Sequence, residues 1–436
     1  MKKGQEYTGR VIERRFPNKG VVETDSRDAA GERCIVKNTI PGQRVRFIVN
    51  KKKAGLTEGR LLSVLEKSPD EIEPACPHFG ICGGCAYQNL TYGDQLNLKE
   101  KQVLELLRGV CMPEGAPYRG EDWVSEVWDG IRPSPIQFEY RNKMEFSFGD
   151  ACFGGELELG LHKIGSIYDI VTVKDCRLVD ADYRKILTET LAYFRGKETP
   201  YYHKKDHTGF LRHLLIRKAA KTGEILIDLI TTSAVPRDTI CTEVSLLEDW
   251  KEALLSLKLK GRIAGILHTV NDSAADAIKD EGTQILYGQD FFYEELLSLR
   301  FKITPFSFFQ TNTLSAEVIY NTAREYVLSV IKQESSSDHN NGNVPASPVD
   351  INDQIKKWAS EAPVIYDLYS GTGTIAQLMS PVAKKVVGVE LVPEAVEAAR
   401  DNAKLNGLHN CKFLEGDVLK VIDQIEEKPD LIILDP

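Results

Sequence analysis

The sequence predicts a multidomain protein with a small N-terminal OB-like β-barrel, a central α+β domain and a C-terminal α/β domain of the Rossmann type. Three observations lead to this prediction. The chain has 436 residues, more than one ordinary hydrophobic core accommodates. Its N-terminal part contains short strands of alternating apolar and polar residues. Its C-terminal part alternates strand patterns with helix patterns.

The composition argues against a membrane protein and against a secreted one. The chain is 42% hydrophobic and 27% charged, and no apolar run approaches the roughly 20 residues of a membrane helix. The charged start, MKKGQEYTGR, is not a signal peptide. We therefore expect a cytoplasmic protein with no membrane partner. Its nine cysteines would stay reduced and act as ligands, nucleophiles or core residues.

Residues 1–67 are expected to form the barrel, a fold that often binds oligonucleotides. Residues 1–60 hold 15 Lys and Arg against 7 Asp and Glu, a balance of +8, whereas the remainder of the chain carries −17. This asymmetry fits a nucleic-acid contact and fits a solvated basic face equally well. Lys51, Lys52 and Lys53 stand together at a predicted strand end, where they could contact phosphates.

Residues 68–129 are expected to contain a cysteine loop followed by a helix. The segment CPHFGICGGCAYQNL places Cys76, Cys82 and Cys85 in a C-x5-C-x2-C pattern, which predicts a metal site. Zinc would need a fourth ligand such as His78, and an iron–sulfur cluster would need a distant cysteine. The candidates for that fourth sulfur are Cys34, Cys111, Cys152, Cys176, Cys241 and Cys411, and spacing alone does not choose among them.

The middle of the chain mixes strand patterns with helix patterns. This mixture predicts a central α+β domain over residues 130–300. Helices are expected near 92–109 and 313–332. The Ser-, Asn- and Pro-rich stretch near 333–354 has little apolar surface to bury, so a flexible insertion is expected there.

The C-terminal segment VIYDLYSGTGTI is an apolar strand ending in an acid and a glycine-rich turn, in which Gly371 and Gly373 are expected to let a ligand approach the backbone closely. The letters GTGTIA also satisfy the dinucleotide fingerprint G-x-G-x-x-A. Glu390 ends the next strand, where a carboxylate can accept both ribose hydroxyls of either NAD or S-adenosyl-L-methionine (SAM). Asp417 after a third strand and Asp435 at the tip of a fourth favour SAM, with the adenine near Asp417 and the methyl centre near Asp435.

Together these motifs resemble the RNA uracil-5-methyltransferases, which make 5-methyluridine in rRNA and tRNA. The closest match is the branch with an N-terminal TRAM barrel and a [4Fe–4S] cluster, the 23S rRNA type. The resemblance covers nearly the whole chain and assigns residues 301–436 to an incomplete SAM-dependent methyltransferase domain. It rests on CPHFGICGGCAYQ, YRNKMEFSFG, VKDCRL, FFQTN, DLYSGTGT, GVE, GDV and LDP, in the family's order.

The resemblance implies which residues bind the cofactors. The [4Fe–4S] cluster would be held by Cys76, Cys82, Cys85 and Cys176. The expected role of this cluster is structural. The SAM and uracil site would contain Gln310, Tyr369, Gly371, Thr374, Glu390, Asp417 and Asp435.

The resemblance also implies a covalent mechanism. A cysteine thiolate adds to C6 of uracil, the resulting enolate attacks the SAM methyl group through C5, and a base then removes the C5 proton. The family places that cysteine and a catalytic glutamate after the DP segment, beyond Pro436. The chain is therefore expected to be truncated and inactive by itself. Cys411 opens a predicted strand and is expected to be a core residue rather than a substitute nucleophile.

Two other functions remain open from the sequence. The G-x-G-x-x-A pattern also suits an NAD-linked oxidoreductase with an iron–sulfur centre. A non-catalytic RNA-binding protein with a degenerate methyltransferase fold fits the missing nucleophile. For the methyltransferase, the expected partner is rRNA, with tRNA as the alternative, and the expected state is a monomer.

Overall fold

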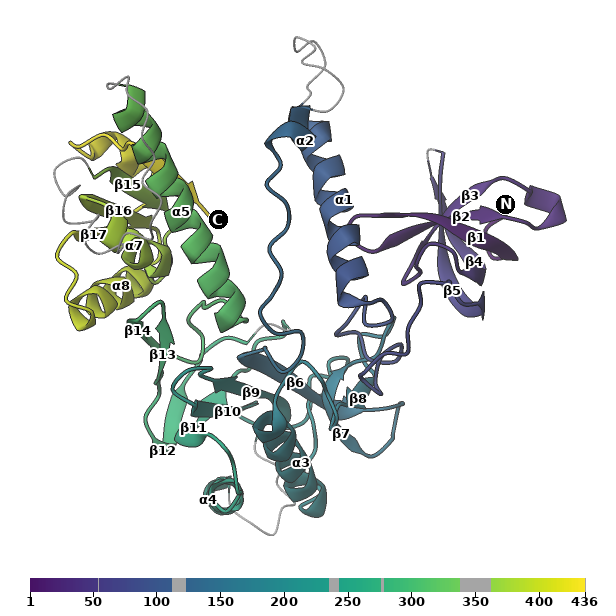
Figure 1. The fold of residues 1–436 in the computed structure, drawn as a ribbon. Coiled ribbons are helices and arrows are strands. Elements are labelled where there is room, and N and C mark those ends of the chain that lie inside the picture. The colour runs from purple at the N-terminus through teal and green to yellow at the C-terminus, as the bar shows by residue number, and fades with distance from the viewer. Residues whose placement is uncertain (54, 112–122, 235–242, 276–277, 338–361, 436) are drawn as a thin grey trace. The chain divides into compact units, whose positions relative to one another are not determined.

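The computed structural model describes residues 1–53, 55–111, 123–234, 243–275, 278–337 and 362–435. The chain divides into two compact units (Figure 1). The first comprises residues 1–133 and 162–165, and the second comprises 134–161 and 166–436. This division into two units does not test the domain limits expected from the sequence, so those limits stay predictions.

The first unit begins with five strands that close into a barrel in the order β1-β2-β3-β5-β4. In β1, β3 and the first part of β4, alternate residues are buried, and valines with Phe47 form much of the interior. The β3–β5 pair is parallel, and the other pairs are antiparallel. The elements are β1 (Glu6–Arg15), β2 (Lys19–Thr24), η1 (Arg27–Ala29), β3 (Arg33–Lys37), β4 (Arg44–Lys53) and β5 (Leu56–Glu66).

Helix α1 (Tyr92–Cys111) follows the cysteine loop and matches the helix expected near 92–109. A short helix, α2 (Trp123–Val127), comes after it. The indole N–H of Trp128 donates to Glu100 at 2.6 Å, which ties the segment after α2 back to α1.

The second unit contains a seven-stranded sheet in the order β12-β11-β10-β9-β6-β7-β8. Helices α3 and α4 pack together through Phe194 and Trp250, and Phe194 also contacts Phe148 of β6, so that both helices belong to this domain's core. The observed mixture of strands and helices is that of an α+β fold. The elements are β6 (Lys143–Asp150), β7 (Leu157–His162), β8 (Ile170–Thr172), α3 (Ala181–Gly196), β9 (Leu211–Lys218), β10 (Glu224–Thr231), α4 (Glu243–Leu255), β11 (Arg262–Val270) and β12 (Thr283–Gly288).

A hairpin and a long helix connect this sheet to the C-terminal domain. The hairpin is formed by β13 (Phe292–Leu296) and β14 (Leu299–Ile303), and the helix is α5 (Thr313–Ser337). Apolar side chains of the sheet, hairpin, helix and C-terminal domain belong to one continuous core. Of the insertion expected near 333–354, the first residues belong to α5, and the part from 338 lies outside the described residues.

The C-terminal domain is a parallel sheet in the order β17-β16-β15-β18, with helices between successive strands. Apolar residues are buried on both faces of the sheet, as the continuous apolar strand patterns require. The expected Rossmann-like α/β domain is thereby confirmed. Its elements are β15 (Val364–Leu368), α7 (Thr374–Met379), η2 (Ser380–Val382), β16 (Lys385–Glu390), α8 (Pro393–Leu405), β17 (Cys411–Glu415), α9 (Val418–Val421), η3 (Ile422–Gln424) and β18 (Leu431–Leu434).

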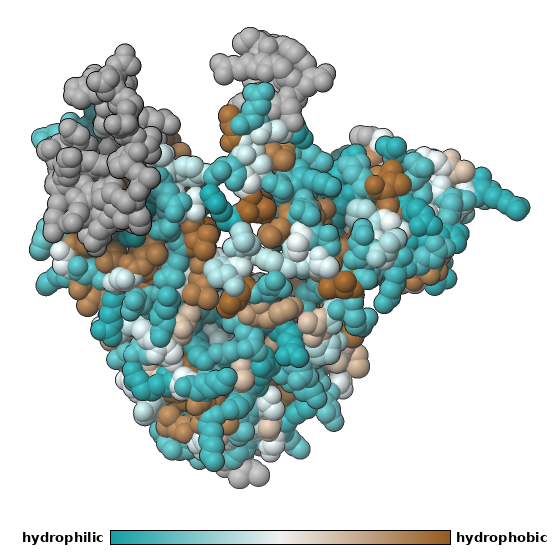
Figure 2. Space-filling view, viewed as in Figure 1, coloured by the Kyte–Doolittle hydropathy of each residue, from teal (hydrophilic) through white to brown (hydrophobic). Residues whose placement is uncertain are grey.

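Hydrophilic residues cover most of the face drawn in Figure 2, and the hydrophobic ones lie in small groups. Among the described residues, none of the helices has the length and apolar character needed to cross a membrane.

Candidate functional site

The carboxyl ends of the four parallel strands meet at one edge of the C-terminal sheet. β15 pairs in parallel with both β16 and β18, and β16 pairs in parallel with β17. Four of the residues predicted to bind SAM follow these strand ends or occupy them: Tyr369, Glu390, Asp417 and Asp435. Ligands of open α/β sheets bind at this edge, so the topology brings the predicted residues to one place.

The glycine-rich turn between β15 and α7 has a backbone that favours glycine. Tyr369, Gly371 and Gly373 have φ values of 66°, 54° and 70°. A Cβ atom on Gly373 would lie 2.5 Å from the Phe413 ring, whereas one on Gly371 would meet no atom within 4 Å. Gly373 is therefore required for packing, while Gly371 leaves open space where a ligand can approach the backbone.

The Glu390 carboxylate is held by backbone N–H groups at the end of β16. Its Oε2 accepts from the Gly371 N–H at 2.9 Å, and its Oε1 accepts from the N–H groups of Leu391 and Val392 at 2.8 and 2.9 Å. These three bonds fix the carboxylate beside the glycine-rich turn. An ionised carboxylate has further lone pairs, so it can still accept ligand hydroxyls.

The structure adds Asp367, which the predicted site omitted. This aspartate lies in β15, is 1% exposed, and accepts from the Ala376 N–H at 2.9 Å. Burial, together with the nearby charges of Asp435 and Glu390, raises the pKa of Asp367 to about 7. An acid in the middle of the apolar run VIYDL is the sequence signal that could have revealed it.

Gln310 belongs to the same cluster. It lies near Tyr320 of α5, whose side chain is 4% exposed. Burial raises the pKa of the Tyr320 phenol, and the charges of Asp435 and Asp367 raise it as well, while the Gln310 amide lowers this pKa slightly. The phenol of Tyr320 therefore stays protonated at neutral pH. No motif singled out Tyr320, which occupies an ordinary position on the buried side of a helix.

Two buried side chains hold the loop that carries Gln310. One guanidinium nitrogen of Arg217 in β9 donates to the carbonyls of Thr304, Pro305 and Ser307 at 2.7, 3.0 and 2.8 Å. Asn142 Nδ2 donates to the carbonyl of Gln310 itself at 2.8 Å. The central domain thus fixes the backbone of this loop by charge-assisted and amide hydrogen bonds.

At the other end of the loop, the same Asn142 Nδ2 also donates to Thr313 Oγ1 at 2.9 Å. The Thr313 hydroxyl in turn donates to Glu294 Oε2 at 2.8 Å. Glu294 is fully buried and also accepts backbone N–H groups of Ala220 and Lys221, at 2.6 and 3.0 Å. The start of α5 is therefore tied to the β9–β10 turn and to β13.

Asp417 and Thr374 occupy helix starts. Asp417 caps α9 by accepting the Leu419 N–H at 3.0 Å, and it lies 3.6 Å from the ammonium of Lys420. Thr374 begins α7, with its hydroxyl 3.5 Å from that of Thr372. Both lie next to the strand ends described above.

Cys411 is held inside the domain. Its thiol donates to the Ala376 carbonyl at 3.8 Å, and its side chain packs against the main core. Burial raises the pKa of this thiol to about 11, which disfavours the thiolate that a nucleophile needs. These contacts agree with the packing role expected for it.

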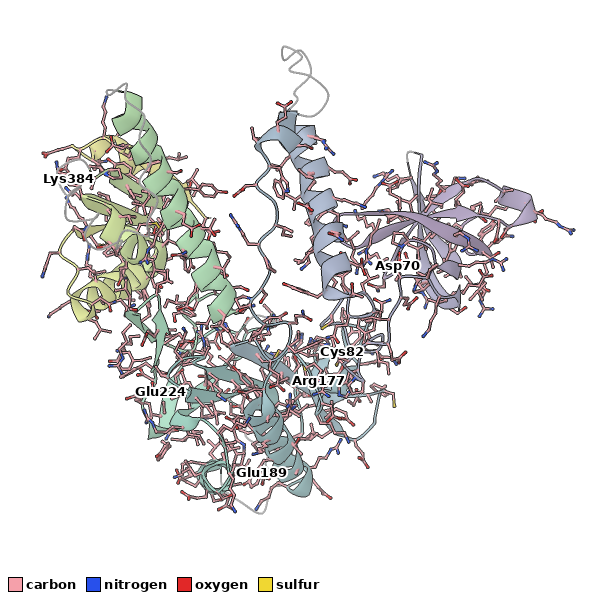
Figure 3. All side chains as sticks on the ribbon, viewed as in Figure 1. Asp70, Cys82, Arg177, Glu189, Glu224 and Lys384 are labelled. Carbon is pink, nitrogen blue, oxygen red and sulfur yellow. The ribbon has the colours of Figure 1, made fainter. Side chains whose placement is uncertain are left out.

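The cysteine loop lies in the first unit, where Figure 3 labels Cys82. The Cys76 and Cys82 side chains are buried, and Cys85 is half-buried. The Gly84 N–H donates to Cys82 Sγ at 3.3 Å, and Gln88 Nε2 donates to Cys85 Sγ at 3.2 Å. Amide donors directed at sulfur suit thiolate ligands of a metal or cluster.

Cys176 belongs to the second unit and is buried in the segment between β8 and α3. Over the ranges that the structure describes, no group of three or more His, Cys, Asp or Glu side chains is arranged to hold a metal ion. The four-cysteine ligand set therefore stays a prediction, as does the alternative in which His78 is a zinc ligand.

Comparisons with known proteins agree with the methyltransferase-like fold and also show the family of the chain. A family model described as a methyltransferase domain matches residues 360–435. An uncharacterized RNA methyltransferase of Clostridium tetani is 42% identical over 436 residues, which is 100% of this chain and 84% of that protein. Another from Caldanaerobacter subterraneus is also 42% identical over 436 residues, covering 100% of this chain and 85% of that protein.

A solved structure has the same fold. The Pyrococcus abyssi tRNA (uracil-54, C5)-methyltransferase, in complex with S-adenosyl-L-homocysteine, matches with a TM-score of 0.66. The match covers 99% of this chain and 83% of that one at 20% identity, which supports a shared fold. The two relatives above are both more than 40% identical and are matched over most of their length. The chain therefore belongs to a family of RNA methyltransferases.

Proposed function

We propose that this protein uses SAM to methylate C5 of a uracil in RNA, with 23S rRNA as the expected substrate. The observation that carries the proposal is that Asp367, Glu390 and Asp435 belong to neighbouring parallel strands of a methyltransferase sheet, at or next to their carboxyl ends. The solved relative of the same fold acts on C5 of a tRNA uracil and was crystallised with the demethylated form of SAM.

Membership of an RNA methyltransferase family decides against the NAD-linked oxidoreductase that the G-x-G-x-x-A pattern left open. It also favours an enzyme over a non-catalytic RNA-binding protein. A direct check is calorimetry of the purified protein with SAM and with NADH. Binding of SAM alone is expected, and binding of NADH alone would contradict the proposal.

In the proposed site, Glu390 accepts the ribose hydroxyls of SAM, and Asp417 lies beside the adenine. The open space over Gly371 lets the cofactor approach the backbone. Asp435, at the end of β18, would place its carboxylate near the sulfonium and amino groups of SAM, which are both cationic. Tyr369, Thr374 and Gly371 complete the turn that would hold the methionine part.

The uracil side of the site is proposed at the loop that ends in Gln310. Phe308 lies two residues before Gln310 and is 73% exposed, so its ring is available to stack on a base. An amide such as that of Gln310 can hydrogen-bond to a uracil edge. The target base must leave its stack to reach this loop, so an unpaired or flipped uridine is the expected substrate.

The proposed chemistry needs a thiolate that adds to C6 of the ring. The C5=C6 electron pair then moves to an enolate, C5 attacks the SAM methyl group, and S-adenosyl-L-homocysteine leaves. A base takes the C5 proton, and the thiolate is expelled as the double bond re-forms, so the nucleophile is regenerated. The described residues bind the methyl donor and orient the base in this scheme.

A [4Fe–4S] cluster held by Cys76, Cys82, Cys85 and Cys176 is proposed with a structural role. The N–H donors directed at Cys82 and Cys85 support it. The closed N-terminal barrel is proposed as a TRAM domain that contacts the RNA.

Mapping of 5-methyluridine by mass spectrometry tests the proposed function. Ribosomal and transfer RNA from cells lacking the gene would be compared with RNA from wild-type cells. At least one 5-methyluridine in 23S rRNA should disappear and return on complementation, but not with a Glu390→Ala copy. An unchanged 5-methyluridine pattern would contradict the proposal, and a loss confined to tRNA would replace rRNA with tRNA as the substrate.

A further inference from the structure

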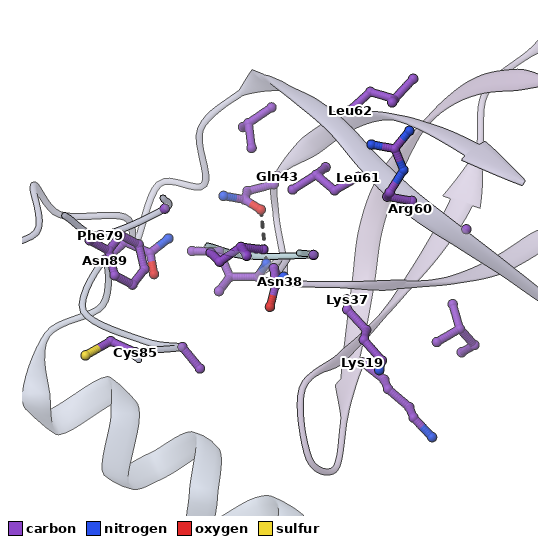
Figure 4. Close-up of a pocket in the computed structure, with 18 of the residues that line it drawn as sticks. Lys19, Lys37, Asn38, Gln43, Arg60, Leu61, Leu62, Phe79, Cys85 and Asn89 are labelled. Carbon is purple, nitrogen blue, oxygen red and sulfur yellow. Dashed lines mark hydrogen bonds between the residues drawn. The ribbon is translucent and has the colours of Figure 1, made fainter. Parts of the chain in front are cut away.

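The first unit contains a groove between the barrel and the cysteine loop (Figure 4). Its volume is about 850 Å³. Barrel residues from β3 and β5 form one wall, and residues 79–89 with 164–165 form the other. Only Cys85 of the three loop cysteines lines the groove, so a cluster bound by those cysteines does not account for this space.

A buried acceptor without a partner lines this groove. Asn89 is 9% exposed, and its Nδ2 donates to Glu71 Oε1 at 3.1 Å. Glu71 Oε2 accepts from Gln43 Nε2 at 2.9 Å, so the glutamate is itself fixed. These bonds determine which end of the Asn89 amide is oxygen, and within the described part of the chain no donor reaches its Oδ1. A buried acceptor left unpaired destabilises the protein, and a ligand N–H that donates to it would remove this cost.

Two lysines stand directly opposite each other at the rim. Lys19 of β2 and Lys37 of β3 are cross-strand partners, and both line the groove. Like charges in such a pair destabilise a sheet, and neither lysine forms an ion pair within the described ranges. An anion between the two ammonium groups would turn this repulsion into attraction.

The other lining residues complete a site of nucleotide character. Arg60 adds a third cation, and the half-buried Phe79 adds an aromatic ring. Of the two carboxylates in the lining, Glu58 lies 3.9 Å from the Lys51 ammonium, and Glu71 is occupied by the amides described above. The cations at the rim suit the phosphate of a nucleotide, and the aromatic ring suits the face of its base. The inner acceptor suits an N–H on the edge of the same base.

We propose that this groove binds an unpaired nucleotide of the RNA substrate. A base N–H donates to Asn89 Oδ1, the base stacks on Phe79, and the backbone phosphate lies between Lys19 and Lys37. This inference rests on the proposed function only in that RNA is the substrate. It places a second RNA-binding site in the first unit, apart from the residues that bind SAM.

The test measures the affinity of the full chain for a fluorescein-labelled single-stranded RNA 15-mer by anisotropy over a range of salt concentrations. The double variant K19A/K37A should bind at least tenfold more weakly. The salt slope should also fall, by about 0.7 for each phosphate that the variant no longer neutralises. The control K2A/K3A removes two exposed lysines outside the groove and should leave affinity and slope unchanged.

A second pair of variants tests the buried acceptor. Asn89→Leu and Gln43→Leu each remove one hydrogen bond to Glu71, but only the first removes the unpaired Oδ1. Gln43 also lines the groove, yet both ends of its amide are already paired, with Glu71 and with the Ile40 N–H, so it has no atom left for a ligand. Asn89→Leu should weaken RNA binding at least fivefold, and Gln43→Leu should not. Ultraviolet cross-linking of 4-thiouridine RNA to the unaltered protein should label the loop around Phe79, a result that does not depend on any variant folding.

The outcomes separate this proposal from the proposed function. Unchanged RNA affinity in K19A/K37A, or cross-links only outside the first unit, would overturn the groove proposal even if 5-methyluridine mapping succeeds. If AMP binds tightly and competes fully with the RNA, the groove would instead be a site for free nucleotides. A third outcome is that K19A/K37A binds RNA more weakly and SAM normally, while the 5-methyluridine mapping finds no uridine that depends on the gene. That outcome would support RNA binding in the groove and refute methylation of uracil C5.

Discussion

The Glu390 carboxylate accepts the backbone N–H of Gly371 at 2.9 Å and thereby joins the end of β16 to the glycine-rich turn after β15. The two residues are 19 positions apart, and the parallel pairing of their strands brings them together. This bond orients the carboxylate that we propose binds the ribose of SAM. It also means that a change at Glu390 would loosen the turn itself.

Glu390→Ala should therefore weaken SAM binding at least tenfold, equivalent to about 1.4 kcal/mol. The substitution removes both the proposed acceptor of the ribose hydroxyls and the bond to Gly371. Calorimetric titration with SAM measures the effect. Glu415→Ala is the control, because Glu415 pairs with Glu390 across the β16–β17 register and is exposed. Equal affinities for the two variants would refute the assignment.

Gly373→Ala should unfold the C-terminal domain more easily. The new Cβ would have a positive φ of 70° and would lie 2.5 Å from the Phe413 ring. Strain and overpacking together should cost about 2–4 kcal/mol of unfolding free energy. Gly371→Ala shares the positive φ but meets open space, so about 1 kcal/mol is expected. Urea denaturation of both variants checks the ranking, and a reversed order would be inconsistent with the packing described.

Asp367→Asn should change how stability depends on pH. Because burial raises the pKa of Asp367 to about 7, above its unfolded value near 3.8, the folded protein holds this proton more tightly than the unfolded chain does. The Asp367 contribution to stability is therefore complete at low pH and is lost as the pH rises from about 4 to about 7. Above pH 7 the loss is complete.

Urea denaturation at several pH values provides the measurement for Asp367→Asn. The asparagine keeps an oxygen that can accept the Ala376 N–H, so the variant should be the more stable protein at neutral pH and should have a flatter profile. Asp228, whose pKa is also raised to about 7 by burial, is present in both proteins and cancels in the difference. Parallel profiles for the two proteins would show that Asp367 does not titrate in this range.

Arg217→Met should release the loop that carries Gln310. The variant leaves three buried carbonyls without their donor, which should cost about 3 kcal/mol or more of stability. Hydrogen exchange of residues 304–313 should become faster. Arg132→Met is the control: it removes an ion pair to Asp129 in which both side chains are exposed, and it should cost less than about 1 kcal/mol. Unchanged exchange in Arg217→Met would mean that other contacts hold the loop.

Cys176→Ser should lose iron if the proposed four-cysteine set is correct. Iron and acid-labile sulfide per chain would be measured after anaerobic purification, together with the thermal midpoint. Cys34→Ser is the control, since Cys34 lies in the barrel core away from the cysteine loop. A full complement of iron in Cys176→Ser would require a different fourth ligand.

The strand-end residues of the candidate site could be predicted from the sequence because a parallel sheet has a simple rule. Consecutive apolar strands with acids at their ends bring those acids to one edge, and Glu390, Asp417 and Asp435 follow this rule. Tyr320 could not be predicted in this way. Its phenol lies near Gln310 and the carboxylates only because α5 packs on the C-terminal domain.

By itself, the sequence determined the α/β pattern of the C-terminal domain, the glycine-rich turn and the resemblance to an RNA methyltransferase family, because these depend on local periodicity and short motifs. Only the tertiary structure decided how the Gln310 loop is held and where the groove of the first unit lies. Arg217 and Thr304 are 87 residues apart, and Asn89 and Gln43 meet through Glu71. Such contacts arise from the packing of distant segments, which no local pattern of residues encodes.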